Sequence, residues 1–204
     1  MTFSRSAFEI LNSMPAATVW EAAGKIGDMN PHIKPMFPGA RLAGPAFTVK
    51  IFPGETFGVL RAIDRAPAGS VIVVDSGGAE RGVCWGGTST LAAVMKCLAG
   101  CVTNGTVRDL AEIQEKQFPI FATGTSLRAG LRGHKGWIDI PVSVGEVPVN
   151  PGDFVLGDID GVVVVPAGRV EEVAALAVKQ REQENAREDR LRSGEPLVDV
   201  LRLG

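Results

Sequence analysis

The sequence predicts a single α/β domain, and three observations support this prediction. Helix-like and strand-like segments alternate along the chain, as in α/β proteins. Two apolar runs, "SVIVVD" and "GVVVVP", have the length and composition of fully buried strands. The 204 residues show no internal repeat and no linker, and they are enough for one sizeable hydrophobic core.

Composition excludes several classes of protein. Hydrophobic residues make up 45% and charged residues 22%, as in an ordinary water-soluble protein. A formal net charge of −2 and a pI near 5.8 argue against nucleic-acid binding. The apolar runs are too short to span a membrane, and the N-terminus lacks a secretory signal pattern. The three cysteines, Cys84, Cys97 and Cys101, are expected to be reduced thiols in the cytoplasm, with Cys97 and Cys101 buried.

Helices follow from apolar periodicity and from capping residues. Thr18 is a candidate cap for the second helix, and Gly100 is expected to end the fourth. The last helix is highly charged and loses its apolar stripe after Val178. The predicted helices cover residues 6–14, 16–27, 55–67, 88–100, 110–117 and 169–193.

Strands are expected between these helices. The segment 46–52 alternates with period two, and the remaining chain up to Pro166 is rich in strand-forming residues. The other strands before that region are predicted within 69–78, 101–109 and 118–124.

A glycine-rich helix start is the first candidate for a ligand site. Gly86 and Gly87 lead into Thr88, whose hydroxyl is a candidate helix cap. The free amides of Thr88 and Ser89, together with the helix dipole, form a cradle suited to a carboxylate. The phosphate-loop signature is absent, because no Lys-Ser/Thr pair follows the glycines. Many such turns bind nothing, so a purely structural role is the alternative.

Adjacent Arg108 and Asp109 strengthen the candidate site. Arg offers a planar fork for a carboxylate or an enolate oxygen, and Asp offers an oxygen ligand for Mg²⁺ or Mn²⁺. At a strand end followed by a helix, both side chains can face one cleft. The alternative is that Asp109 caps the helix beginning at Leu110 while Arg108 forms a surface ion pair.

The chain resembles the metal-dependent 4-hydroxy-4-methyl-2-oxoglutarate/4-carboxy-4-hydroxy-2-oxoadipate aldolases, which are related to the RraA proteins that inhibit ribonuclease E. The resemblance covers most of the chain and lies in the shared order of its motifs. It implies an αββα sandwich of the swivelling-domain kind and a homotrimer or a dimer of trimers. The motifs are "GARLAGPAFTV", "AGSVIVVDSGG", "WGG…LAA", "NGTVRDL", "FPIFATG" and "VPVNPGDFVLGDIDGVVVVP".

The resemblance also implies roles for individual residues. Arg108 would hold the pyruvyl part of a 2-oxo acid substrate, and Asp109 would bind a divalent metal, Mg²⁺ or Mn²⁺. The amides of Thr88 and Ser89, in the turn begun by Gly86 and Gly87, would hold the substrate carboxylate. The reaction would be a retro-aldol cleavage to pyruvate through an enolate, with oxaloacetate decarboxylation as a side activity.

Two positions depart from the family pattern. The pattern has an acidic residue where this chain has Gly87, and Asn104 stands where many relatives have Asp. Loss of a general base costs about 10²–10⁴-fold in rate. Because decarboxylation needs no hydroxyl proton removed, it is expected to survive this loss better than aldol cleavage. Glu80 and Asp75 are candidate replacements for the acid, although a loop salt bridge of Glu80 with Arg81 is the favoured interpretation of Glu80.

Two functions of different classes follow. The first is a divalent-metal-dependent lyase with Arg108 and Asp109 at its centre, which acts on small 2-oxo acids without nucleic-acid or membrane partners. This hypothesis includes an enzyme with a changed substrate. The second is a non-catalytic RraA-like regulator that binds a ribonuclease or another RNA-processing enzyme. Retention of the Arg-Asp pair favours the first, and the glycine at position 87 favours divergence.

Overall fold

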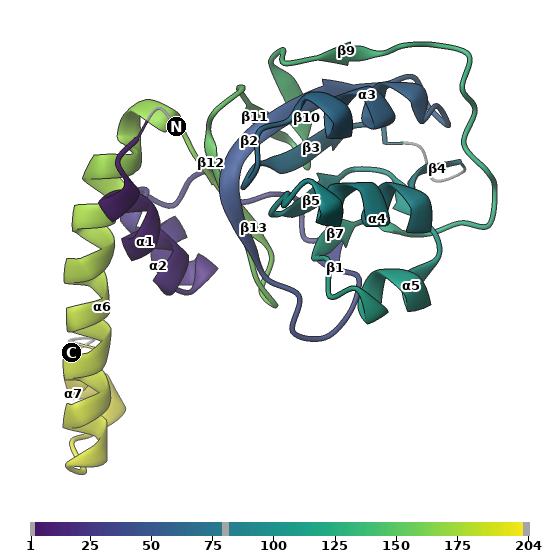
Figure 1. Ribbon diagram of the computed structural model, residues 1–204. Helices are drawn as coiled ribbons and strands as arrows, with labels where there is room; N and C mark the ends of the chain where they lie inside the picture. Colours follow the sequence, from purple (N-terminus) through teal and green to yellow (C-terminus); the bar gives the residue numbers. More distant parts are fainter. Residues whose placement is uncertain (1–2, 79–81, 202–204) are drawn as a thin grey trace.

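The computed structural model describes residues 3–78 and 82–201, and a curled eight-stranded sheet forms its centre (Figure 1). The predicted α/β fold is confirmed. The strands of this sheet are β1 (Lys34–Pro35), β2 (Leu42–Lys50), β3 (Val71–Asp75), β5 (Gly100–Thr103), β7 (Ile120–Ala122), β9 (Trp137–Ile138), β12 (Phe154–Gly157) and β13 (Val162–Val165).

Five short strands lie outside this sheet. Three of them form a small parallel sheet in the order β4-β6-β8, and the other two form the β10–β11 hairpin. The small sheet leads directly into two helix starts, which makes it important for the candidate site. The five strands are β4 (Val83–Trp85), β6 (Thr106–Val107), β8 (Gly124–Thr125), β10 (Val142–Val144) and β11 (Val147–Val149).

Helices pack against the parallel strands and beside the β12–β13 hairpin (Figure 1). Three of them, α3 to α5, connect the parallel strands β2, β3, β5 and β7, as crossover helices do in α/β proteins. No helix among the described residues is long and apolar enough to cross a membrane. The helices are α1 (Arg5–Ser13), α2 (Ala16–Ala22), α3 (Phe57–Arg65), α4 (Gly87–Met95), α5 (Leu110–Glu115), α6 (Val170–Arg192) and α7 (Leu197–Val200), with a 3₁₀ turn, η1, at Ala167–Arg169.

Strand β2 is shared between two parts of the sheet. Its residues 42–45 pair antiparallel with β12, and its residues 46–50 pair parallel with β3. The sheet order is therefore β1-β7-β5-β3-β2-β12-β13, with β9 also paired to β2. A nine-residue strand is long enough to join both partners without a break.

The hairpin of β12 and β13 separates two hydrophobic cores. Successive side chains of a strand point to opposite faces, and here each face meets a different core. Val155 and Val164 contribute to the core beneath α3 to α5. Phe154 and Val163 contribute to the core shared with α1, α2 and α6.

The predicted C-terminal charged helix, residues 169–193, corresponds to α6. Only its first turns are buried, through Val170, Val173, Ala174 and Ala177. These turns pack against α1 and α2, and the rest of α6 extends beyond them, with α7 folded back against it (Figure 1). The apolar stripe of α6 therefore ends at the point where the helix leaves the hydrophobic core.

Three local expectations were wrong. Thr18 lies inside α2, whose N-cap is Pro15. Helix α4 ends at Met95, and Gly100 begins β5 instead of closing the helix, because Cys97 adopts the left-handed conformation, with φ 54°, that turns the chain. Cys97 is consequently exposed, whereas Cys84 and Cys101 are buried.

Thiol labelling of the native protein is predicted to modify Cys97 alone. Burial raises the pKa of the Cys84 thiol to about 11 and the pKa of the Cys101 thiol well above its usual range, so neither forms the reactive thiolate at mildly alkaline pH. Mass spectrometry after iodoacetamide treatment should detect one adduct, and the urea-unfolded chain should carry three. A second adduct on the folded protein would contradict this assignment of burial.

Candidate active site

The candidate active site lies where α4 and α5 begin next to each other. A cavity of about 300 Å³ is lined by Gly86, Gly87, Thr88 and Ser89 from the start of α4. Arg108 and Asp109, which follow β6, line the same cavity. The structure thus brings together all six site residues proposed from the sequence.

Strands β4 and β6 position the two helix starts. They pair in parallel, with Val83 opposite Thr106 and Trp85 opposite Val107. Each is followed directly by a turn into a helix, so the residues after Trp85 and after Val107 lie side by side. The amide of Arg108 donates to the carbonyl of Trp85 at 3.1 Å and extends this pairing into the site.

Asp109 has a backbone conformation that is unusual for a residue with a side chain. Its φ of 62° and ψ of 42° lie in the left-handed region, which costs about 1–2 kcal/mol for most residues. The left-handed turn ends the extended segment at Arg108 and starts α5 at Leu110. It allows neighbouring Arg108 and Asp109 to line one cavity, although consecutive residues of a strand point to opposite faces.

The Asp109 carboxylate joins the two helices. Its Oδ2 accepts a hydrogen bond of 2.9 Å from the Gly87 amide, the first amide of α4. The same oxygen lies 3.4 Å from Arg108 Nε. These side chains are 35% and 41% exposed, and such an ion pair contributes under about 1 kcal/mol. Stability alone therefore does not explain the arrangement.

Both predicted caps differ from expectation. Gly86, not Thr88, is the N-cap of α4, and as a glycine it has no side chain with which to cap the helix. Asp109 is the N-cap residue of α5, but its carboxylate bonds to Gly87 instead of capping α5. Because the first amides of a helix have no acceptor within the helix, those of Thr88 and Ser89 are available to a ligand in the cavity.

Glu112 is the acidic residue that sequence reasoning missed. It lies in the first turn of α5, and its carboxylate packs against Gly87, where an added Cβ would overlap Oε2 and lie 2.8 Å from Cδ. A Cβ at Gly86 would likewise lie 2.8 Å from Asp109 Oδ2. The two glycines are therefore needed because two carboxylates from α5 occupy the space beside them. The spacing Asp109-x-x-Glu112 could have indicated this from the sequence, since residues three apart lie on the same face of a helix.

Of the two candidate acids named from the sequence, Asp75 does not reach this site. The Asp75 carboxylate accepts from the Gly77 amide and lies 3.4 Å from Lys50 Nζ, away from the cavity. Glu80 lies outside the described residues. Glu112 is thus the acidic side chain that the described chain brings to Gly87.

A divalent metal suits the residues present. Asp109 Oδ1 and the Glu112 carboxylate are hard oxygen donors, and neither has a hydrogen-bond partner among the described residues. In residues 3–78 and 82–201, no group of three or more His, Cys, Asp or Glu side chains is placed to hold a metal. A site with two carboxylates and several waters fits Mg²⁺ or Mn²⁺, not a metal that needs a complete protein cage.

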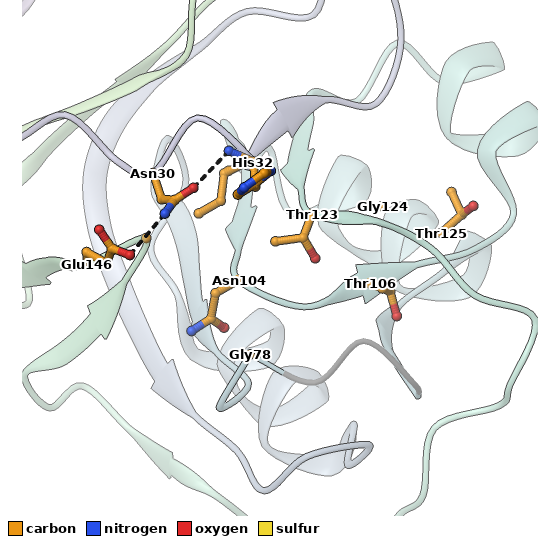
Figure 2. A pocket seen from close by; sticks show the side chains of 11 residues that line it. Asn30, His32, Gly78, Asn104, Thr106, Thr123, Gly124, Thr125 and Glu146 are labelled. Atoms are coloured by element: carbon orange, nitrogen blue, oxygen red, sulfur yellow. Dashed lines mark hydrogen bonds between the residues drawn. The ribbon is translucent and has the colours of Figure 1, made fainter.

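A second, larger cavity of about 560 Å³ lies where strands β5 and β7 end (Figure 2). The described residues of its lining include Asn30, His32, Asn104 and Glu146, with no Arg or Lys among them, in contrast to the cavity of Arg108. Asn104, the second departure from the family pattern, lines this cavity and accepts hydrogen bonds from the amide and hydroxyl of Ser76. The Asn104 substitution therefore lies outside the Arg108 cavity.

Comparison with known proteins identifies the family. A family model described as RraA-like (Aldolase/RraA) matches residues 16–164, which include every residue named in the candidate site. The chain belongs to the RraA-like family. In Halalkalibacterium halodurans, a protein named "Putative 4-hydroxy-4-methyl-2-oxoglutarate aldolase" is 34% identical over 177 residues, which cover 86% of this chain and 84% of the relative.

Solved structures of similar proteins share the fold. An uncharacterized protein from Pseudomonas syringae superposes with a TM-score of 0.86 at 26% identity, over 97% of this chain and 98% of that one. RraAS2 from Streptomyces coelicolor, described as an unusual member of the RNase ES inhibitor RraA family, superposes with a TM-score of 0.80 at 27% identity. That match covers 90% of this chain and 96% of RraAS2. The family resemblance inferred from the sequence motifs is confirmed.

Replacing Thr90 with Val is predicted to lower the free energy of unfolding by about 1–3 kcal/mol, because a buried donor loses its acceptor. Thr90 Oγ1 accepts from the indole nitrogen of buried Trp85 at 2.9 Å and donates to the Gly86 carbonyl at 3.0 Å, directly beneath the glycine turn. Urea unfolding would measure the change. Thr90→Ser keeps the hydroxyl but loses the methyl group and is the control; a loss in Thr90→Val no larger than that in Thr90→Ser would contradict the role of the hydrogen bond.

Proposed function

We propose that this protein is a divalent-metal-dependent lyase that cleaves 2-oxo acids to pyruvate through an enolate. The observation that carries the proposal is the joint placement of Arg108, Asp109 and Glu112 beside the open amides of α4. An anion cradle, a guanidinium and two carboxylates with oxygens open to a ligand meet the needs of enolate chemistry. The aldolase name of a relative 34% identical to this chain supports the same reaction.

Each residue has a defined task in the proposed reaction. The amides of Thr88 and Ser89 hold the substrate C1 carboxylate. Arg108 stabilises the negative charge that develops on the C2 oxygen as the C3–C4 bond breaks. Asp109 and Glu112 hold the Mg²⁺ or Mn²⁺ ion, which supplies additional positive charge near the enolate when bound.

Glu112 has a second task in aldol cleavage. The C4 hydroxyl must lose its proton as the C3–C4 bonding pair moves to C3, and a carboxylate within reach can accept that proton. Protonation of the enolate at C3 then yields pyruvate. Oxaloacetate loses CO₂ by breaking the corresponding bond, and no hydroxyl proton has to be removed. The same site therefore serves both reactions, with different demands on Glu112.

Replacing Asp109 with Asn is predicted to reduce metal-dependent pyruvate release by about 10²–10³-fold, the range for loss of one preorganised electrostatic group. Asn tolerates the left-handed backbone conformation, so the fold should survive this change. Coupling pyruvate to lactate dehydrogenase, with and without Mg²⁺ or Mn²⁺, measures the activity on oxaloacetate and on 4-hydroxy-4-methyl-2-oxoglutarate.

Arg108→Lys runs beside Asp109→Asn and should also lose activity, because lysine keeps the charge but not the planar fork. An unchanged melting temperature in both variants is the control for folding. Wild-type protein that releases no pyruvate from either substrate with either metal would refute the lyase assignment.

Replacing Glu112 with Gln should separate the two reactions. Aldol cleavage is expected to fall by about 10²–10⁴-fold more than oxaloacetate decarboxylation, because only aldol cleavage needs a base for the hydroxyl proton. The quantity compared is the ratio of kcat values for the two substrates. Equal losses would assign Glu112 to metal binding alone.

An acid placed on the other helix is expected to restore part of the lost aldol activity. Gly87→Asp in the Glu112→Ala background puts a carboxylate at the same place from α4, where the Glu112 side chain no longer blocks it. Gly87→Asp alone is the control. It should be poorly active, because its side chain overlaps Glu112 and two like charges repel.

The second candidate function is regulation of an RNA-processing enzyme, and the likeness to RraAS2 favours it. Binding of an RNase E-type endoribonuclease by isothermal titration calorimetry tests this function directly. Binding that is equally strong in Asp109→Asn, combined with no pyruvate release from the wild type, would favour the regulator over the lyase.

A further inference from the structure

A second arginine, Arg132, lines the same cavity as Arg108. It belongs to the long connection between β8 and β9, far along the chain from both helix starts. The hydrogen bonds of this connection engage the neighbouring amides of Gly133 and His134 but not the Arg132 guanidinium. No carboxylate in residues 3–78 or 82–201 pairs with Arg132. The cavity therefore has a cation that the lyase proposal does not use.

The backbone on both sides of Arg132 is held in place. Leu131 exchanges hydrogen bonds with the segment before α3: its amide donates to the Gly54 carbonyl at 2.7 Å, and its carbonyl accepts from the Thr56 amide at 2.8 Å. The Glu55 carboxylate accepts from the amides of Gly133 at 2.9 Å and His134 at 3.3 Å. An arginine on a fixed backbone binds an anion with less ordering cost than one on a loose loop.

The connection also packs closely against β4, whose end begins the site. A Cβ at Gly130 would lie 2.6 Å from the carbonyl oxygen of Val83. Only a glycine allows the chain to pass this close to β4. This contact keeps the segment carrying Arg132 against the cavity wall.

The balance of charge indicates what Arg132 binds. Asp109 and Glu112 together carry two negative charges, which a divalent ion neutralises in the proposed enzyme. Arg108 and Arg132 then leave two positive charges, and these match a dianion. A 2-oxo acid brings one negative charge in its C1 carboxylate, so the second charge belongs to another carboxylate. Guanidinium groups bind carboxylates through paired hydrogen bonds.

We propose that Arg132 is a specificity-determining residue that binds the second, distal carboxylate of a 2-oxo dicarboxylic acid. This inference rests on the proposed function, because it takes the C1 carboxylate to lie at the α4 amides. Arg132 acts on substrate choice and takes no part in bond cleavage. Its removal should therefore weaken only those ligands that carry the distal charge.

The first test measures equilibrium binding, independently of turnover. Calorimetry with the Mg²⁺-loaded protein compares 2-oxoglutarate with 2-oxopentanoate, which has the same chain length but no distal carboxylate. Neither acid has a 4-hydroxyl, so aldol cleavage does not disturb the measurement. The wild type should bind 2-oxoglutarate more tightly. Arg132→Gln should reduce this preference about ten- to a hundredfold, the range for a lost hydrogen bond to a charged group, and leave 2-oxopentanoate binding unchanged.

Arg128→Gln is the matched control. Arg128 lies on the same connection and is exposed, but it does not line the cavity, so its replacement makes an identical change in net charge away from the site. This variant should keep the wild-type preference. Loss of preference in Arg128→Gln, or equal weakening of both acids in Arg132→Gln, would overturn the proposal in favour of general electrostatic attraction.

The second test measures turnover with a matched pair of substrates. 4-Hydroxy-4-methyl-2-oxoglutarate gives two molecules of pyruvate, whereas 4-hydroxy-4-methyl-2-oxopentanoate gives pyruvate and acetone by breaking the equivalent bond. Arg132→Gln should lower kcat/KM for the first substrate about ten- to a hundredfold and leave the second unchanged.

The two proposals fail in different ways. Pyruvate release with a substrate ratio that Arg132→Gln does not change would refute the role of Arg132 and leave the lyase intact. Preferential binding of 2-oxoglutarate that depends on Arg132, without pyruvate release, would refute the lyase and keep the dicarboxylate site. If neither acid binds to the metal-loaded wild type and no pyruvate is released, both proposals are wrong.

Discussion

The hydrogen bond from the Gly87 amide to the Asp109 carboxylate is the constraint on which the candidate site depends. It ties the start of α4 to the start of α5, two elements that the pairing of β4 with β6 already places side by side. The bond requires Asp109 to turn into the left-handed conformation, and that turn lets Arg108 line the same cavity. The site also requires glycine at positions 86 and 87, because the carboxylate oxygens of Asp109 and Glu112 occupy the space that side chains there would take.

The position of the acidic group illustrates how one site can be built from either helix. The family pattern inferred from sequence places an acid on α4, whereas here Gly87 leaves room and Glu112 on α5 fills it. Because the two helices begin next to each other, a carboxylate from α4 or from α5 reaches the same point. The electrostatic energy of a bound ion depends on the position of the carboxylate, not on which helix carries it.

The two hydrophobic cores stabilise different parts of the molecule. The core beneath α3 to α5 supports the strands that end at the site. The core formed with α1, α2 and α6 lies across the β12–β13 hairpin, and from it α6 extends beyond the sheet (Figure 1). Alternation along β12 and β13 allows one thin hairpin to serve both, because neighbouring valines face opposite sides.

The sequence by itself determined the α/β class, the buried strands and the charged C-terminal helix, and it singled out Arg108 and Asp109 as candidates for one site, since local periodicity and short motifs encode these features. The helix end expected at Gly100 and the cap expected at Thr88 were wrong, because Cys97 turns the chain earlier and carboxylates from α5 occupy the glycine turn. Only the tertiary structure decided that Glu112 meets Gly87 and that Arg132 enters the cavity of Arg108. Those contacts depend on which strands pair and on how closely segments far apart in the sequence approach each other. No local pattern along the chain encodes these separations in space.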